Sequence, residues 1–269
     1  MSAQEQSWLC LVYHGLLPAP VSRGGGPEWF GVPAATFARQ LDLLRAAGYQ
    51  GCSLAEATAH GARRVAITFD DGVASDYERA FPTLVERQMT ATFFVITDRV
   101  GSPGFVTWPQ LREMREAGMS IESHTRTHPF LSELSPKALH DELVGAKGAL
   151  DDALGQDTTQ LALPGGDAPR GRLYGLIAEA GYHVVATSRW GRNGQAHGLV
   201  PRSIRRCTVA GDVSDLRFRR VLAGDWAIDL RRRLREVVLG NVRALLGPSR
   251  YASLRRRILE RTRALPWEI

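Results

Sequence analysis

The chain has 269 residues, 44% of them hydrophobic and 23% charged, a composition typical of a globular protein with a substantial core. Residues 216–269 contain 14 arginines and 5 acidic residues, a charge of +9, which leaves −3 on residues 1–215 for the net charge of +6. We expect neither a signal peptide nor a membrane span, because the apolar stretch at residues 8–13 is too short for either. Cys10, Cys52 and Cys207 form no closely spaced pair, so we expect reduced thiols and a cytoplasmic location.

Short apolar runs alternate with segments of helical period up to residue 187. A loop rich in Pro and Gly at residues 18–33 separates the first strand from the first helix, which we expect Thr36 to cap. The alternation predicts a parallel sheet covered by helices, either open or closed as a barrel. The predicted strands are residues 9–13, 65–69, 91–96, 119–123, 161–163 and 182–187, and the predicted helices are residues 36–47, 76–88, 108–117, 136–154 and 172–180.

The alternation ends near residue 215, so we divide the chain into residues 1–215 and a basic helical extension, residues 216–269. Basic helices are predicted at residues 213–235, 236–246 and 251–264. They either lie on an anionic membrane surface, or pack on the first domain as a cap with an arginine-rich face in solvent. The charge would also suit nucleic acid, but the chain contains no recognition motif, and we expect no nucleic-acid partner.

Two carboxylates, Asp70 and Asp71, follow the strand predicted at residues 65–69 and precede Gly72. Ligand and catalytic sites of α/β sheets and barrels lie at this carboxyl end of the strands. Adjacent side chains on an extended segment point to opposite sides, so one Asp can bind a metal while the other faces a water. Taken alone, Asp-Asp-Gly is also a common turn sequence.

Two histidines, His124 and His128, follow the strand predicted at residues 119–123. Their spacing places them on one face if the chain turns helically after Ser123, although Pro129 limits how far such a turn continues. An isolated pair of this spacing is a weak signal, but a pair after one strand and two Asp after another is a strong one. Two His and one Asp leave a coordination position open, as in a hydrolytic metal site.

Several segments of the chain, taken together, resemble one known family. They are residues 12–14 (VYH), 67–72 (ITFDDG), 91–95 (ATFFV), 123–129 (SHTRTHP), 162–166 (ALPGG) and 180–182 (AGY). The resemblance is to the polysaccharide deacetylase family (NodB homology, carbohydrate esterase family 4), and it extends from residue 9 to about residue 206.

The resemblance implies a distorted (β/α)7-type barrel for residues 1–215, which would be the catalytic domain. It implies that Asp70 is the general base and that Asp71, His124 and His128 bind a divalent metal, usually Zn2+ and sometimes Co2+ or another ion. The implied reaction removes an acetyl group, usually from an N-acetylated sugar, by attack of a water on the acetamide carbonyl and protonation of the departing amine.

The general acid is where this chain departs from the common pattern of the family. Most members carry the acid on a His near the end of the domain, but residues 198–206 contain no His. One branch resembles the biofilm poly-N-acetylglucosamine deacetylases and places this His at the end of the first strand, where His14 stands. His14 is our candidate acid, with a role limited to shaping the first loop as the alternative, and His197 is the next candidate.

A second departure concerns the arginine that steadies the base in many members, because Leu161 occupies its place. Arg170 either reaches the site or a sugar hydroxyl, or lies solvated at a helix start. Pro164 and Gly165 are expected to form a tight turn at the rim of the site, and Trp190 to stack on a sugar ring.

We therefore expect a cytoplasmic metal-dependent deacetylase of an N-acetylated saccharide, either a polysaccharide or a glycolipid precursor. If the basic helices bind lipid, the contact would be peripheral, at the inner face of the membrane. One alternative is an O-acetyl esterase or a hydrolase of a non-peptide C–N bond in a small molecule, since an ester leaving group needs less protonation. The other is a catalytically idle saccharide-binding protein, which would have no need of an open metal site.

Overall fold

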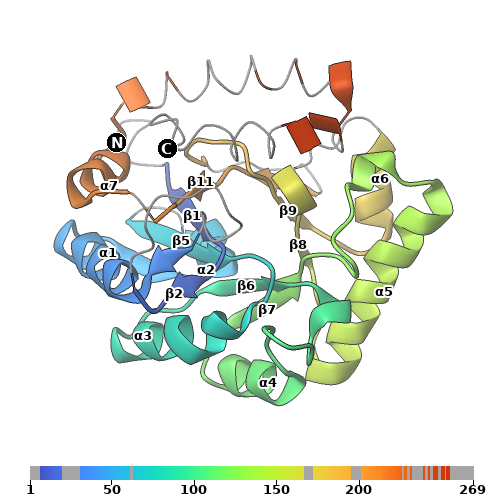
Figure 1. Cartoon of the computed structure of the whole chain (residues 1–269), viewed down its shortest axis with the longest axis horizontal. Helices are drawn as coiled ribbons and strands as arrows, with labels where there is room; N and C mark the ends of the chain where they lie inside the picture. The colour runs from blue at the N-terminus through green and yellow to red at the C-terminus, as the bar shows by residue number, and fades with distance from the viewer. Residues whose placement is uncertain are drawn as a thin grey trace.

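The computed structural model describes residues 7–19, 31–60, 63–166, 172–194, 201–211 and 213–225, with scattered residues from 227 to 254. Parallel strands occupy the middle of the molecule and helices surround them (Figure 1). The strands of the main sheet are β1 (Leu9–Tyr13), β4 (Gln50–Cys52), β5 (Arg64–Phe69), β6 (Thr92–Val95), β7 (Ser120–Ser123), β8 (Gln160–Ala162), β9 (Val184–Ala186), β10 (Arg202–Ile204) and β11 (Cys207–Thr208); β2 (Leu16–Leu17) and β3 (Val32–Pro33) form a separate pair. The helices are α1 (Ala34–Ala46), α2 (Leu54–His60), α3 (Phe81–Glu86), α4 (Trp108–Glu116), α5 (Pro136–Leu154), α6 (Arg172–Glu179) and α7 (Asp215–Leu222).

The order of the strands shows that the sheet is curled. It runs β10-β9-β8-β7-β6-β5-β1-β11, and β4 pairs with the remaining part of β5. The strands at the two ends of this order, β10 and β11, are joined by only Arg205 and Arg206. Three Cα steps span no more than roughly 11 Å, so the two ends of the sheet must approach one another. This curled parallel sheet with outer helices confirms the expected distorted (β/α) barrel.

An aromatic ladder aligns the carboxyl ends of three central strands. Tyr13, Phe69 and Phe93 are register partners on β1, β5 and β6, and their rings stack with centroid distances of 5.3 and 4.9 Å. Phe37 of α1 meets the first two rings edge-on. All four side chains are buried, and such aromatic pairs add stability beyond the area they bury. His14 directly follows Tyr13 and Asp70 directly follows Phe69, so the stacked rings fix the backbone positions from which these two residues extend.

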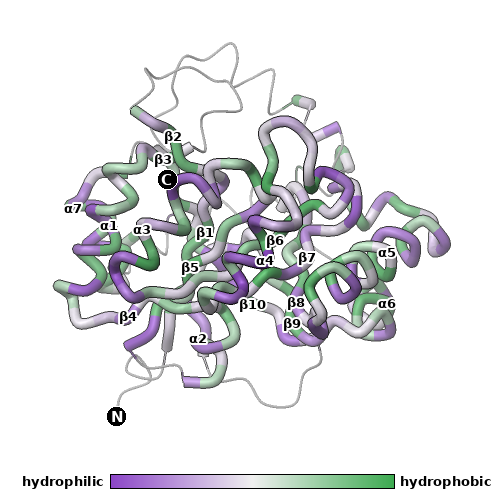
Figure 2. The backbone as a smooth tube through the Cα atoms, turned by 90° about the horizontal axis from the view of Figure 1, so that it is seen from below, coloured by the Kyte–Doolittle hydropathy of each residue, from purple (hydrophilic) through white to green (hydrophobic). Residues whose placement is uncertain are grey.

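Hydrophobic positions concentrate on the strands and on the inner sides of the helices, as Figure 2 shows. The long helix α5 illustrates the pattern, since Leu139, Leu143, Ala146, Leu150 and Leu154 recur every three or four residues and are buried. Ser135 caps its start by accepting a hydrogen bond from Ala138 N–H. It ends, as predicted, at a left-handed Gly155.

One predicted helix start was wrong, and the first turns of another predicted helix have a different geometry. Helix α1 begins at Ala34, two residues before the predicted cap Thr36. Its N-cap, Pro33, is extended (φ −56°, ψ 133°) and is the last residue of β3, so the helix starts directly where that strand ends. The helix predicted at residues 76–88 is instead a π-helical turn, Asp76–Ala80, followed by α3. Pro82 has no N–H and would clash with the preceding turn of an α-helix, which the wider π turn avoids.

Short elements were missed, namely β2, β3, β4, α2, β10 and β11. Strand β4 contains Gly51, where a Cβ would lie 2.7 Å from both Ile67 Cδ1 and Met89 Sδ, so the packing requires glycine. Glycine does not favour a strand in the sequence, which is why this strand was missed. Of the predicted basic helices, α7 lies within residues 213–235, and most of the rest is outside the described residues. No helix in the described part of the chain is long and apolar enough to span a membrane.

Candidate metal centre and active site

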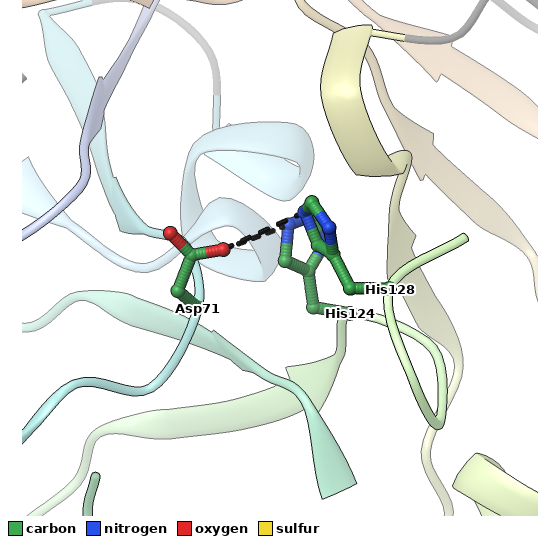
Figure 3. A group of neighbouring side chains, drawn as sticks. All are labelled: Asp71, His124 and His128. Carbon is green, nitrogen blue, oxygen red and sulfur yellow. Dashed lines mark ion pairs between the residues drawn. The ribbon is translucent and has the colours of Figure 1, made fainter. Parts of the chain in front are cut away.

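The structure brings Asp71, His124 and His128 into one group at the carboxyl ends of β5 and β7 (Figure 3). One ligand atom from each lies within 4.8 Å of the other two. Asp71 Oδ1 is 3.5 Å from His124 Nε2 and 3.6 Å from His128 Nε2. The imidazole rings are 4.8 Å apart and meet edge to face, so both Nε2 atoms point toward the same carboxylate.

A strained turn presents the Asp71 carboxylate. Asp71 has φ 79° and Gly72 has φ 72°, so two successive residues are left-handed directly after Asp70. A left-handed conformation costs a non-glycine residue on the order of 1–3 kcal/mol, and such strain clusters at functional sites. A Cβ at Gly72 would lie 2.9 Å from Val95 Cγ1, so only glycine fits beside β6. Val106 N–H also donates to Gly72 O, which holds the turn in place.

The segment that carries the two histidines is an irregular loop, and the predicted helical turn after Ser123 is absent from it. Thr125 has φ 65° and His128 has φ 68°, which no α-helix accommodates. Thr125 Oγ1 accepts a hydrogen bond from His128 N–H at 3.0 Å. The spacing of four therefore brings both rings together through a turn with two left-handed residues, not through one face of a helix.

His124 is oriented by a second contact on its other ring nitrogen. Nδ1 lies 2.9 Å from the backbone O of Ala162, at the end of β8. A carbonyl can only accept, so this contact places a proton on Nδ1, and Nε2 is the ring nitrogen that faces Asp71. Ligating histidines in metalloproteins are characteristically oriented by such a partner.

The electrostatics of the group suit a cation. Burial, and secondarily the charge of His124, lowers the pKa of His128 to about 4, so its ring is neutral and can act as a ligand at neutral pH. Burial alone would lower the pKa of His124 as well, but the carboxylates of Asp70 and Asp71 outweigh it and raise the pKa. Two imidazoles and one carboxylate form a donor set for Zn2+, Co2+ or a similar ion, with a position left open.

The second carboxylate, Asp70, is held by an arginine that the sequence did not reveal. Arg206 Nη1 and Nη2 donate to Asp70 Oδ1 and Oδ2 at 2.6 and 2.7 Å, and both side chains are buried. Burial alone would raise the pKa of the Asp70 carboxyl, but the Arg206 guanidinium outweighs it and the pKa lies well below its ordinary value. The Oδ2 atom is 4.0 Å from His124 Nε2, so the ionised carboxylate borders the metal group.

Arg206 stands at the seam between β10 and β11, and its remaining contacts are also internal. Nε donates to the backbone O of Thr187, Nη1 to Thr68 Oγ1, and the guanidinium lies 5.6 Å from the centroid of the Phe94 ring. The sequence feature that could have indicated this role is the pair Arg205–Arg206 between two short extended segments. In extended backbone one of two adjacent side chains faces inward, and a buried arginine requires a buried carboxylate as its partner. Leu161, at the position where many members of the family carry this arginine, is buried in the core, and Arg170 lies outside the described residues.

His14 directly follows β1 and is half-buried. Burial lowers the pKa of its imidazole, and the charges of Asp70 and Asp71 act in the opposite direction. Because β1 and β5 are neighbouring parallel strands with Tyr13 opposite Phe69, His14 lies at the same edge of the sheet as Asp70. His197 lies outside the described residues.

The residues expected at the substrate rim have different outcomes. Pro164 and Gly165 lie in a turn that begins two residues after the end of β8, and a Cβ at Gly165 would overlap the ring of Phe130, two residues after His128. Trp190 is only 6% exposed and belongs to the main core, so its predicted stacking on a sugar is corrected to a packing role. Arg170, the remaining residue expected there, lies outside the described residues.

Comparisons with known proteins agree with this geometry. A protein-family model for polysaccharide deacetylases matches residues 57–185. YxkH of Bacillus subtilis (strain 168), whose name places it among polysaccharide deacetylases, is 30% identical over 194 residues, 70% of this chain and 68% of that protein. A chitooligosaccharide deacetylase of Bradyrhizobium sp. (strain ANU 289) is 37% identical over 101 residues, 36% of this chain and 42% of that protein. The structure of the Streptococcus pyogenes deacetylase PplD in complex with acetate superposes with a TM-score of 0.68 at 28% identity, covering 78% of this chain and 96% of that one.

Proposed function

The chain belongs to the polysaccharide deacetylase family, and we propose that it is a metal-dependent hydrolase that removes N-acetyl groups from a saccharide. The observation that carries the proposal is the convergence of Asp71, His124 and His128 on one point, with the buried Asp70–Arg206 pair beside them. A pure saccharide-binding protein has no use for a three-ligand group with a separate, ionised carboxylate.

Asp71, His124 and His128 would hold the divalent ion. The ion would supply Lewis acidity, which polarises the acetyl carbonyl and lowers the pKa of a water. The chain contributes the orientation of the donors: the carbonyl of Ala162 fixes the His124 tautomer, and the left-handed turn aims Asp71 at both rings.

Asp70 is the proposed general base. Its Oδ2 borders the metal group, and Arg206 keeps the carboxylate ionised in a buried place where it would otherwise be protonated. Both oxygens retain lone pairs beyond the two contacts with Arg206, so Oδ2 can accept a proton from a nearby water. Arg206 thus acts on the chemistry by holding and charging Asp70.

His14 is the proposed general acid. Burial lowers the pKa of its imidazole, so the ring must take up a proton before it can protonate the departing amine, and in that protonated form it is a strong donor. An amine must be protonated to leave, whereas an ester oxygen leaves more readily. A functional His14 would therefore matter most for an N-acetyl substrate.

The substrate class follows from the relatives, among which one is named a chitooligosaccharide deacetylase. We propose an N-acetylated oligosaccharide or polysaccharide as the substrate, approaching over the turn at Pro164–Gly166. A cytoplasmic location and a membrane contact of the basic C-terminal extension stay predictions.

The test is acetate release from N-acetylated chitooligosaccharides and from simple acetyl esters, measured on the purified protein, after chelation, and after adding Zn2+ or Co2+. We expect chelation to abolish release from the amides and metal to restore it. Asp71→Ala and His128→Ala should bind no metal, whereas Asp70→Asn should bind metal and lose turnover. His140→Ala is the matched control, because this histidine is exposed on α5 and is not a member of the metal group. Turnover by Asp70→Asn at the wild-type rate would refute the base assignment.

A further inference from the structure

The loop between the two histidine ligands is held from α5 by one buried carboxylate, that of Glu142. Oε2 accepts hydrogen bonds from the backbone N–H groups of Arg126 and Thr127 at 3.0 and 2.9 Å, and Oε1 accepts from Thr127 Oγ1 at 2.7 Å. Glu142 is only 7% exposed. We infer that Glu142 is a positioning residue of the metal centre, an inference that rests on the proposed function.

The position of these contacts carries the inference. All three end on Arg126 and Thr127, which lie between His124 and His128. The side chains of Arg126 and Thr127 are exposed, so the loop is fixed mainly through its backbone. Whatever moves this backbone moves one histidine relative to the other.

The loop is anchored on two sides, and Glu142 provides one of them. On the other side, Thr97 N–H and Asp98 N–H donate to the carbonyls of Thr125 and Arg126. Those contacts hold the carbonyl side of the loop, while the two N–H groups at its tip donate to Glu142. Because Thr125 and His128 are left-handed, no regular helix or strand would supply partners for these N–H groups.

Helix α5 is shaped to receive the loop. Three residues after Glu142, a Cβ at Gly145 would lie 3.3 Å from Arg126 Cδ, tighter than most such contacts. The Arg126 side chain therefore lies close over a helix position that carries no side chain, and its backbone reaches the carboxylate one turn earlier. Hydrogen bonds to a charged acceptor are roughly twice as strong as neutral ones, which suits a residue that must hold a strained loop.

The experiment measures the affinity of the full-length protein for Zn2+ by competition with a chromophoric chelator, and the visible absorption spectrum of the Co2+-loaded protein. Loss of a partner that orients metal ligands typically lowers metal affinity about 10–100-fold, and we expect a loss of that size for Glu142→Ala. Glu142→Gln keeps one oxygen acceptor for the N–H groups, so its affinity for Zn2+ should lie between that of the wild type and that of Glu142→Ala. Asp141→Ala is the matched control, because the Asp141 carboxylate is exposed and pairs with Lys137. This variant should bind metal like the wild type.

Each outcome decides the inference. Zn2+ affinity and a Co2+ spectrum unchanged in Glu142→Ala would overturn it, as would an equal loss in Asp141→Ala. If Glu142→Ala does not fold, Glu142→Gln decides, because wild-type affinity and spectrum in that variant would also overturn the role. A wild-type protein that binds neither Zn2+ nor Co2+ would instead refute the proposed function. The two failures are distinguishable, because the first is seen in the wild type alone and the second only when the variants are compared with it.

Discussion

Replacing Arg206 with Met should remove the charge that keeps Asp70 ionised while leaving a side chain of similar length. Both members of the pair are almost fully buried, and two donor–acceptor contacts of 2.6 and 2.7 Å join them. Removing one partner of a buried pair leaves an uncompensated charge and typically costs about 3–5 kcal/mol. The contacts to Thr187 O and Thr68 Oγ1 are lost as well, so we expect the upper part of this range.

The loss should depend on pH in a defined direction. In the wild type the pKa of Asp70 lies below its unfolded value, so Asp70 contributes stability above about pH 4 that is lost as pH falls through the folded pKa. In Arg206→Met, burial dominates and raises the folded pKa of Asp70 above the unfolded value. Its contribution is then favourable at acidic pH and is lost as pH rises. The difference in unfolding free energy between the two proteins should therefore be smallest in acid and largest near neutrality.

Two assays measure this effect. Urea unfolding of the metal-free proteins at several pH values gives the stability difference, and acetate release across the same range gives the pH profile of kcat/KM. We expect the acidic limb of the profile, where the base becomes protonated, to move to higher pH in Arg206→Met. Arg205→Met is the control, because this adjacent arginine is exposed. A variant with an unshifted acidic limb, or with a stability loss that does not grow toward neutral pH, would refute the reasoning.

Two further predictions concern single residues near the site. Asp76 is 1% exposed, its carboxylate oxygens have no hydrogen-bond partner among the described residues, and burial followed by the charges of Asp71 and Asp70 raises its pKa well above the ordinary value. Because its pKa is raised, Asp76 destabilises the folded protein progressively as pH rises. Asp76→Asn should therefore stabilise the protein at neutral pH, and thermal melting at pH 5 and 8 should show a larger gain at the higher pH. His14→Gln should lower kcat on an N-acetyl sugar about 10²–10⁴-fold with a much smaller effect on an acetyl ester and none on Zn2+ affinity. Equal losses on both substrates would argue against His14 as the acid.

The sequence predicted the positions from which the ligand group is built, because those positions are set by strand ends. Asp71 and His124 each follow within two residues of a largely buried strand, and parallel strands bring their carboxyl ends to one edge. The pairing of β5 with β6 and of β6 with β7 then places the two side chains near one another. The local sequence thus predicted that Asp71 and His124 lie close together, but it did not predict the left-handed turns of the loops that carry them.

What the sequence did not predict depends on contacts between distant segments. Arg206 reaches Asp70 across 136 residues, through a seam that exists only when β10 and β11 close the curled sheet. Glu142 reaches Thr127 from a helix whose exposed and buried positions looked like ordinary amphipathic spacing. Trp190 looked available in sequence because a run with Gly, Arg and Asn resembles a surface loop, but the fold buries its ring. In each case the role of the residue depends on a contact with a segment distant in sequence, which the local sequence around the residue does not indicate.

The division of labour between Asp70 and Asp71 shows how the backbone separates two adjacent carboxylates. Alternation along an extended strand predicted that they would face opposite sides, and Asp70 does continue the strand ladder by donating its N–H to Tyr13 O. Asp71, however, is left-handed, so a turn and not the pleat of the strand directs it to the histidines. The turn is possible because Gly72 leaves room for Val95. One carboxylate is thus buried against a guanidinium and the other is aimed at two imidazoles, which is the separation that a base and a metal ligand on neighbouring residues require.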